Sequence, residues 1–527
     1  MSRHQIAPKN DLKDGELRAV SVGETELVLA RAEGHVTAFQ AHCPHNGAPL
    51  AKGVLSGSRL VCPWHHACFS AQTGDLLEPP ALDALVRFEI IHEGDALFVE
   101  LPGEGDITGR LPELATPGGD DTRVFVVLGA GAAGTTAAQT LREDGFGGRI
   151  VLVTHESTPP YDRTLLSKGV LAGQAEPKPL RNGSFYDVHG VELLSQTATQ
   201  LDPAAQLLRF EGGDTLRYDA LLLATGSTPV PLEVPGVELG GIFYLRTLQD
   251  SQALAAAAEG TQAVVVGASF IGLECASSLR ERGVEVTVIT PNTVPFEGLF
   301  GREVGEMFRA LHEENGVTFV FEGKVARFSG DDRVTHAVLE DGRELPADFV
   351  TVGVGVKPNL PEVKGLELSE DGSVSVDRFL QLAGDYGPIY AAGDLARYPD
   401  PYSGRPVRVE HWRLAMQHGR AAAHGMAGRE RAFGAVPFFW TKQHGLNVRY
   451  VGHASNWDEV VIDGDLNAHE FLAYYLEAGE LRAVLGAGRD ADLCAVEECL
   501  RLGALPSAAD LRARRVAWPT QLASATS

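Results

Sequence analysis

Two short motifs near the start of the chain combine cysteine and histidine in a pattern that could bind iron. Cys43 and His45 form one arm, Cys62 and His65 form the other, and residues 46–61 separate them. In an ordinary zinc finger the two cysteines form one knuckle and the two histidines lie together on a helix, whereas here each arm supplies one of each. That mixture fits a [2Fe–2S] cluster in which two thiolates hold one iron and two imidazoles hold the other. The sequence therefore predicts such a cluster, and a zinc site is the alternative.

Two glycine-rich loops further along the chain could each bind a dinucleotide. The first, GAGAAG, follows the apolar run VFVVL, and the second, GASFIG, follows AVVV. In such loops the glycines allow the backbone to approach a pyrophosphate at the N-terminus of the next helix. The predicted phosphate-binding positions are Gly129, Gly131, Gly134, Gly267, Ser269 and Gly272.

The residue at the end of the strand that follows each loop is expected to contact the ribose of the nucleotide. Glu156 lies at the distance from the first loop where an acid accepts a hydrogen bond from a ribose hydroxyl. At the matching place after the second loop, Thr290 is neutral. An acid there would select NADH and a nearby arginine would favour NADPH. Because no cation follows Thr290 directly, the sequence favours NADH.

The pattern of elements around these motifs changes along the chain. From about residue 17 to residue 101, short alternating strands and turns predict a small all-β domain. Apolar runs then alternate with helical stretches, which is the pattern of βαβ units on a parallel sheet. Strands return between about residues 436 and 489, before one more helix, and predict a compact α+β domain.

The overall composition excludes several classes of function. The 527 residues include 45 Lys plus Arg and 70 Asp plus Glu, for a formal net charge of −25. Such acidity argues against a nucleic-acid binder or an anchor on anionic lipid. No apolar run is long enough for a membrane span or a secretory signal, and six cysteines are too few for a disulfide scaffold. We therefore expect a cytoplasmic protein.

The front motifs also resemble a known family. CPHNGAPL and CPWHHACF resemble the two loops of Rieske [2Fe–2S] domains, over roughly residues 1 to 102. This resemblance implies that the four residues of the two arms, Cys43, His45, Cys62 and His65, are the cluster ligands.

The region from residue 123 to about 430 resembles the ferredoxin-reductase branch of the pyridine nucleotide-disulfide oxidoreductase family. The matching motifs are PPYDRTLLSK, LLLATGSTP, VGVGVKPN and IYAAGDLA, besides the two glycine-rich loops. The resemblance implies FAD in the first fold and NAD(P)H in the second, with Lys168 beside the flavin and paired with Glu274. It also places Trp440 by the flavin ring and implies that Lys168, Glu274 and Trp440 act in catalysis. The remaining FAD-binding residues that it implies are Arg163, Thr225, Gly226, Gly393 and Asp394.

Taken together, the chain resembles the apoptosis-inducing-factor-like Rieske flavoproteins. The predicted fold class is multidomain: an all-β Rieske domain, two Rossmann-like α/β domains and a C-terminal α+β domain. The expected boundaries are 1–102 for the Rieske domain, 103–122 for a linker, 123–245 and 353–430 for a discontinuous FAD domain, 246–352 for the NAD(P)H domain, 431–512 for the C-terminal domain and 513–527 for a frayed tail.

The predicted activity is transfer of electrons from NAD(P)H through FAD and the cluster to an unidentified acceptor protein. No cysteine lies just after PPYDRTLLSK, and no CxxC lies near either glycine-rich loop. Both absences argue against disulfide-reductase chemistry, which needs a reactive thiol there. One alternative is an NADH-responsive redox sensor. Another is a Rieske oxygenase, which would need a further iron site of two histidines and a carboxylate. The sequence leaves a homodimer open.

Overall fold

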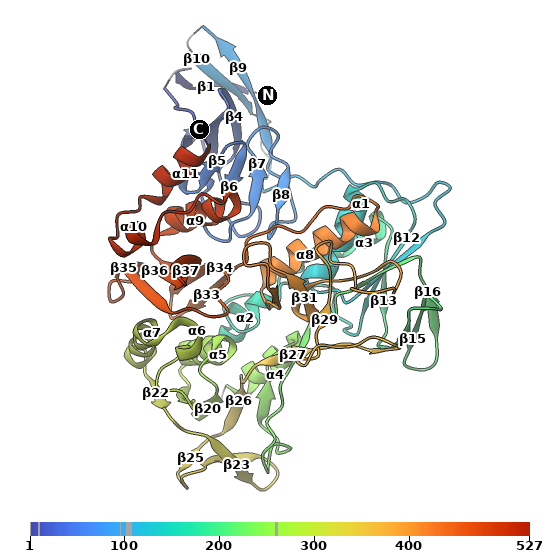
Figure 1. Cartoon of the computed structure of the whole chain (residues 1–527), viewed down its shortest axis with the longest axis vertical. Coiled ribbons are helices and arrows are strands. Elements are labelled where there is room, and N and C mark those ends of the chain that lie inside the picture. The colour runs from blue at the N-terminus through green and yellow to red at the C-terminus, as the bar shows by residue number, and fades with distance from the viewer. Residues whose placement is uncertain (1, 9–10, 95, 102–107, 259–261, 527) are drawn as a thin grey trace.

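The computed structural model describes residues 2–8, 11–94, 96–101, 108–258 and 262–526, and these residues form four packed units (Figure 1). The first unit, in blue, lies beside the last, in red, although they are at opposite ends of the chain. One hydrophobic cluster joins them, since Val54 and Val61 pack together with Leu493 and Trp518. The predicted linker falls partly on residues 102–107, which lie outside the described residues.

The first unit contains two antiparallel sheets. Strand β3 is buried on both sides: Leu27 and Leu29 face one hydrophobic cluster, while Val28 and Ala30 face another. The alternation follows from the two-residue period of a strand. The larger sheet has the order β1 (Ser2–Pro8), β10 (Ala96–Leu101), β9 (Arg87–Glu93), β4 (His35–Gln40), β3 (Thr25–Ala32) and β2 (Leu17–Val22), and the smaller has β5 (Val54–Ser56), β6 (Arg59–Val61), β7 (Cys68–Ser70) and β8 (Leu76–Glu78).

The second unit is built on a parallel sheet whose last strand comes from much later in the chain. Helices α1 (Ala132–Glu143) and α8 (Trp412–Met426) pack together closely. A Cβ at Gly419 would lie only 2.1 Å from the carbonyl oxygen of Ala133, so only glycine permits this approach. The strand order is β13 (Val191–Ser195), β12 (Arg149–Thr154), β11 (Val124–Leu128), β17 (Ala220–Leu223) and β30 (Ile389–Ala391).

The third unit repeats this plan with another parallel sheet. Its first strand, β19 (Ile242–Tyr244), pairs with β26 (Phe349–Val352), so the expected boundary at residue 245 falls one strand late. The order is β19, β26, β20 (Gln262–Val266), β21 (Glu285–Ile289) and β22 (Val317–Val320), with helices α4 (Leu248–Ala257), α5 (Phe270–Glu281), α6 (Glu297–Phe300) and α7 (Arg302–Glu314), and an antiparallel sheet of β23 (Val325–Gly330), β24 (Val334–Leu339) and β25 (Glu344–Pro346).

The chain crosses between these two units in β18 (Ser227–Pro229) and β27 (Val356–Pro358), which pair with each other. Shorter elements complete the second unit: helices α2 (Gly169–Ala172) and α3 (Gly183–Val188), a sheet of β16 (Thr215–Arg217), β15 (Leu207–Phe210), β14 (Ala198–Asp202) and β28 (Glu362–Val363), and a sheet of β29 (Val374–Ser375), β31 (Ala396–Pro399) and β32 (Pro406–Val407).

The last unit is an antiparallel sheet covered by helices. Its order is β33 (Phe438–Gln443), β34 (Leu446–Gly452), β37 (Glu480–Ala487), β36 (Glu470–Glu477) and β35 (Glu459–Asp465), with α9 (Asp490–Leu502), α10 (Ala508–Arg512) and α11 (Trp518–Thr526). The predicted multidomain fold class, with all-β, α/β and α+β parts, is confirmed. No helix within the described ranges is long and apolar enough to cross a membrane.

The expectation of a frayed tail was wrong. Residues 518–526 form α11, in which the side chains of Trp518 and Leu522 are buried. The Trp518 indole Nε1 donates a hydrogen bond of 3.1 Å to the Tyr474 hydroxyl. The small polar residues suggested disorder, but two apolar side chains one turn apart give the helix a buried face.

We expect Trp518→Ala to lower the free energy of unfolding of the last unit by about 3–5 kcal/mol, because a fully buried indole is removed. Urea denaturation followed by tyrosine and tryptophan fluorescence measures this. The exposed Thr520→Ala variant is the matched control and should unfold like the parent. Equal stability of both variants would mean that α11 does not anchor the fold.

Candidate functional site

The four predicted cluster ligands lie on two loops of the first unit, one after β4 and one between β6 and β7. In the first loop the Cys43 N–H donates to the Ala48 carbonyl at 2.8 Å, and in the second the Cys62 N–H donates to the Ala67 carbonyl at 2.9 Å. Each bond closes its loop into a tight turn. The structure thus holds one cysteine of each arm in a fixed turn within the same unit.

The side chains of the two loops converge. The Nδ1 atoms of His45 and His65 are 3.1 Å apart, and the thiols of Cys43 and Cys62 are within hydrogen-bonding contact. Burial lowers the pKa of His45 to about 3 and holds that of His65 well below its ordinary value, so both rings are neutral. Neutral imidazoles keep a lone pair for a metal.

The two thiols differ in their electrostatics. Burial raises the pKa of Cys43. Burial also acts to raise the pKa of Cys62, but the hydrogen bond from Cys43 and the N–H groups of Trp64 and His65 lower it overall. Because a ligating cysteine is a thiolate, these N–H groups would support the charge on sulfur.

These groups fit a [2Fe–2S] cluster with mixed ligands. Among the residues described, no point is surrounded by three or more histidine, cysteine, aspartate or glutamate donors. A cluster of this type does not require one, because each iron takes only two ligands from the protein. The two loops bring one pair of sulfurs into contact and one pair of ring nitrogens to 3.1 Å, which matches that donor set.

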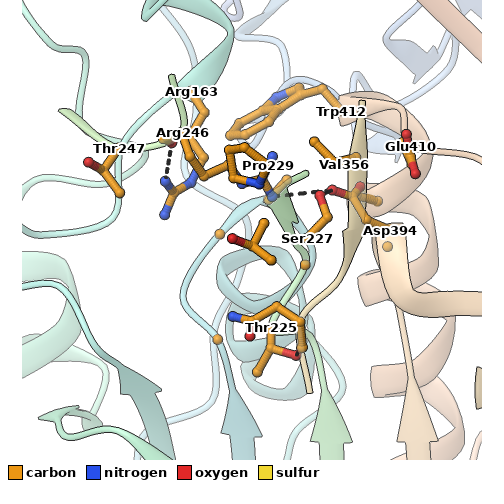
Figure 2. Close-up of a pocket in the computed structure, with 18 of the residues that line it drawn as sticks. Arg163, Thr225, Ser227, Pro229, Arg246, Thr247, Val356, Asp394, Glu410 and Trp412 are labelled. Carbon is orange, nitrogen blue, oxygen red and sulfur yellow. Dashed lines mark hydrogen bonds and ion pairs between the residues drawn. The ribbon is translucent and has the colours of Figure 1, made fainter. Parts of the chain in front are cut away.

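A large cavity of about 790 Å³ lies between the second, third and last units, and Figure 2 shows part of its lining. At Gly131 a Cβ would meet no atom within 4 Å, so the backbone is open to the cavity where helix α1 begins. Helix α1 has no side-chain cap, which leaves its first N–H groups available to an anion. Nearby, the buried Nδ1 of His411 has no hydrogen-bond partner among the described residues. An open helix start and an orphaned polar atom fit a bound dinucleotide.

Most of the predicted nucleotide-binding residues line this cavity, and three glycines do not. Gly134, Gly267 and Gly272 pack too closely for a side chain: a Cβ at Gly134 would lie 1.8 Å from the Gly129 carbonyl oxygen. These three glycines let the backbone of the two loops pack closely, and they do not contact the cavity. The residues that line the cavity are Gly129, Gly131, Glu156, Arg163, Lys168, Thr225, Gly226, Ser269, Glu274, Gly393, Asp394 and Trp440.

Glu156 is held by two neighbours. Its Oε2 accepts a hydrogen bond of 2.6 Å from the Tyr161 hydroxyl, and its Oε1 pairs with Arg163. Burial opposes its ionisation, yet Arg163 and the Tyr161 hydrogen bond keep the pKa of Glu156 below its ordinary value. The carboxylate is therefore charged and fixed at the cavity wall.

Asp394 has partners that sequence reasoning missed. Its Oδ2 accepts from the Ser227 hydroxyl at 2.6 Å and from Arg246 at 3.2 Å, as Figure 2 shows. Arg163 in turn donates to the Arg246 carbonyl at 2.9 Å. Arg246 belongs to none of the recognised motifs, and its partner Asp394 is 148 residues away in sequence, so nothing marked it in advance.

Lys168 and Glu274 meet, as predicted from the resemblance. The Lys168 ammonium lies 2.6 Å from Glu274 Oε2, which also accepts a hydrogen bond of 2.5 Å from Ser167. The other oxygen, Oε1, accepts from the Thr441 hydroxyl at 2.7 Å. Ser167 and Thr441 were also missed, because hydroxyl residues are common and their spacing carries no signal.

Trp440 lies between the cavity and the cluster loops. Its ring lines the cavity, and its centroid is 4.3 Å from that of the His65 imidazole and 6.2 Å from that of His45. A single indole therefore connects the two candidate sites. Sequence reasoning placed it only beside the nucleotide.

Buried charges fix the first unit against the rest of the protein. His66, next to the predicted ligand His65, contacts Glu497 of α9 at 2.5 Å, and Glu497 also pairs with Arg413 of α8 at 2.8 Å. Burial acts to raise the pKa of Glu497, but Arg413 and His66 lower it. Arg413 also reaches Glu78 of the first unit at 3.3 Å. His66, Arg413 and Glu497 are buried and Glu78 is partly exposed, and together they tie the second cluster loop and β8 to helices α8 and α9.

The remaining cysteines take no part in the cavity. Cys68, Cys275, Cys494 and Cys499 are buried and unpaired, and burial raises the pKa of each thiol. None of them is among the residues that line the cavity in the described part of the chain. Their environment is that of inert core thiols.

Three family models match the chain. The model described as pyridine nucleotide-disulphide oxidoreductase matches residues 123–419, the Rieske [2Fe-2S] domain model matches residues 2–89, and the reductase C-terminal model matches residues 438–518. The first of these models covers more than half of the chain.

Known proteins are similar over most of this length. The chain is 35% identical to apoptosis-inducing factor 3 of Homo sapiens, over 94% of this chain and 83% of that protein. It is 36% identical to the ferredoxin–NAD(+) reductase component of the biphenyl dioxygenase system of Paraburkholderia xenovorans, over 65% of this chain and 84% of that protein. A crystal structure of the ferredoxin reductase for the CYP199A2 system from Rhodopseudomonas palustris superposes with a TM-score of 0.70 at 31% identity, covering 74% of this chain and 97% of that one.

We expect Arg413→Met to lower the free energy of unfolding by about 3–5 kcal/mol, because Glu497 is left as a buried charge without its main partner. Chemical denaturation measures this loss. In Arg429→Met the lost ion pair with Asp144 is half exposed, so the change should not exceed about 1 kcal/mol. Similar values for the two variants would contradict a role for Arg413 in holding the first unit.

Proposed function

This chain belongs to the pyridine nucleotide-disulphide oxidoreductase family, and we propose that it is an FAD-dependent NAD(P)H oxidoreductase that passes electrons through its own Rieske cluster to an acceptor protein. The single observation that carries this proposal is the position of Trp440, which lines the nucleotide cavity and contacts the ring of His65. An electron carrier fused to the reductase with one ring between the two centres needs no diffusional encounter for the first transfer.

The roles of FAD and the [2Fe–2S] cluster follow from how many electrons each can take at once. Bound FAD would take two electrons as one hydride and pass them on singly, which is how a [2Fe–2S] cluster can accept them. The chain's own residues bind and orient: Glu156 and Asp394 are fixed acceptors on the cavity wall, and Gly131 lets the backbone approach a phosphate. Lys168 supplies a cation that would favour the anionic reduced form.

We assign the first α/β unit to FAD and the second to the nicotinamide nucleotide, with the four loop residues as cluster ligands. The order of the motifs and the convergence of Cys43, His45, Cys62 and His65 support this assignment. The proposed FAD residues are those of the first glycine-rich loop together with Glu156, Arg163, Lys168, Thr225, Gly226, Gly393 and Asp394, and the proposed NAD(P)H residues are Gly267, Ser269, Gly272 and Glu274.

NADH is the proposed donor. Thr290, which directly follows strand β21, is buried, and the next residues, Pro291 and Asn292, bring no cation for a 2′-phosphate. The acceptor is a protein that takes one electron at a time. A cytoplasmic location belongs to the same proposal and rests on the six cysteines, which are unpaired and fit a reducing compartment.

An anaerobic titration with NADH tests the function. In the parent protein we expect the flavin absorbance to bleach and a Rieske-type EPR signal to appear. In Cys43→Ser the EPR signal should vanish because an iron ligand is lost. The flavin should still be reduced, because the change leaves the nucleotide cavity intact. Cys275→Ser is the matched control, since it alters an equally buried cysteine away from both loops.

A different pattern would favour the redox-sensor alternative, which the similarity to apoptosis-inducing factor 3 keeps in view. In that case only the flavin would respond in the parent protein, and a long-wavelength absorbance band would persist without sustained reduction of a one-electron acceptor. Loss of both signals in Cys43→Ser would contradict the separation of the two centres.

We expect Trp440→Leu to slow the appearance of the reduced cluster in stopped-flow measurements while the rate of flavin bleaching by NADH stays close to that of the parent. The reason is that the indole bridges the cavity and His65. Trp457→Leu, which removes an indole packed on Gly301, is the control and should leave both rates unchanged. Equal cluster rates in the parent and Trp440→Leu would remove Trp440 from the path.

A further inference from the structure

A continuous series of side-chain hydrogen bonds runs from a surface hairpin to the Lys168–Glu274 pair. His444 Nε2 lies 3.1 Å from His312 Nδ1, and His312 Nε2 lies 2.8 Å from Gln443 Oε1. Gln443 Nε2 donates to the Thr441 hydroxyl at 3.0 Å, and that hydroxyl donates to Glu274 at 2.7 Å. The series therefore ends on the carboxylate that holds Lys168.

The direction of each bond is set by chemistry. A threonine hydroxyl has one hydrogen, and because Gln443 Nε2 donates to its oxygen, that hydrogen is directed to Glu274. The amide of Gln443 is oriented in turn by His312, whose Nε2–H donates to Oε1. His312 then accepts at Nδ1 from the Nε2–H of His444. All donors point toward Glu274.

The protonation of His312 agrees with this order. It is fully buried, and burial lowers its pKa to about 3, so the ring is neutral at physiological pH. A neutral imidazole has one donor and one acceptor nitrogen, as the series requires. A charged ring would present two donors, and the Nε2–H of His444 would have no acceptor.

The carboxylate needs this support because it is almost fully buried, with a side-chain exposure of 5%. Lys168 and Ser167 occupy its Oε2, which leaves Oε1 to Thr441. Without the Thr441 hydroxyl, Oε1 would lose its side-chain donor, and the carboxylate would turn to share its remaining partners. Such a turn would move the Lys168 ammonium.

The series also joins three units of the molecule. Lys168 belongs to the second unit, Glu274 and His312 to helices α5 and α7 of the third, and Thr441 and Gln443 to strand β33 of the last. The His444 backbone N–H is fixed as well, since it donates to the Ser277 hydroxyl on α5 at 2.7 Å.

We propose that Thr441, Gln443 and His312 are positioning residues, which hold Glu274 so that its Oε2 stays directed at Lys168 beside the flavin. This inference rests on the proposed function, in which Lys168 faces the flavin. It goes beyond that function because it assigns control of the flavin's reduction potential to three side chains that act on the flavin only through Glu274 and Lys168. Their effect should appear in the flavin's equilibrium reduction as well as in turnover.

The decisive variant is Thr441→Val, which keeps the side chain's shape but removes the hydroxyl. We expect the equilibrium constant for two-electron reduction of the bound flavin to fall roughly tenfold, which corresponds to about 30 mV, in a titration with a chemical reductant and a reference dye. Stopped-flow hydride transfer at saturating NADH should slow roughly tenfold, since a hydrogen bond to a charged group is lost.

Gln443→Met should shift the potential in the same direction, and adding it to Thr441→Val should cause no further change, because both act through one hydroxyl. Thr441→Ser retains the hydroxyl and should behave like the parent. Thr351→Val removes a buried hydroxyl of β26 that has no partner among the described residues, and should have no effect.

Three results would overturn the inference: an unchanged potential in Thr441→Val, additive effects of Thr441→Val and Gln443→Met, or failure of Thr441→Ser to retain the parent potential. If Thr441→Val loses FAD, the comparison of Gln443→Met with Thr441→Ser decides the question alone. Failure of the parent to oxidise NADH would refute the proposed function instead, and the titration with a chemical reductant would still test the positioning role.

Discussion

The alternation of side chains along a single strand, β33, governs how the two candidate centres meet. Phe438 stacks on His66 with centroids 4.1 Å apart, and Trp440 lies against His65, so the even-numbered residues face the cluster loops. Phe439 lines the nucleotide cavity, which Trp440 also reaches, and Thr441 contacts Glu274 on helix α5. Because successive side chains of a strand point to opposite faces, any shift of β33 by one residue would exchange these partners. Its register with β34 therefore sets the geometry on both sides.

How much of this arrangement could be predicted depends on the range of the interactions. The loop motifs were predictable because ligand chemistry needs particular residue types at short spacing, as at Cys43 and His45. The glycine-rich loops were predictable because a close backbone approach excludes side chains, as the packing at Gly134 shows. Arg246 and Thr441 were not, since their partners are 148 and 167 residues away in sequence. Ordinary hydroxyl and guanidinium groups gain their roles only when the sheets assemble.

At the C-terminal end of the described chain, the sequence predicted disorder where the structure has a helix. Composition alone favoured disorder for residues 513–527, while the apolar residues Trp518 and Leu522 at helical spacing indicated a buried face. The hydrophobic cluster that receives Trp518 also contains Val54 and Val61 of the first unit. The end of the chain thus packs against the domain that begins it, and a prediction made one domain at a time does not reveal such a contact.

The interface between the cluster domain and the reductase combines apolar packing with buried charges, and the covalent connection explains why this is tolerated. Burying Arg413 and Glu497 costs desolvation energy that a diffusing partner would have to recover in affinity. Here the tether supplies a high effective concentration, so the interface need not provide the affinity of a free complex. What the charges provide is orientation: Glu497 contacts His66, whose neighbour His65 meets Trp440. Because buried charges tolerate few arrangements, this network suits an interface that must hold the His65 ring against Trp440.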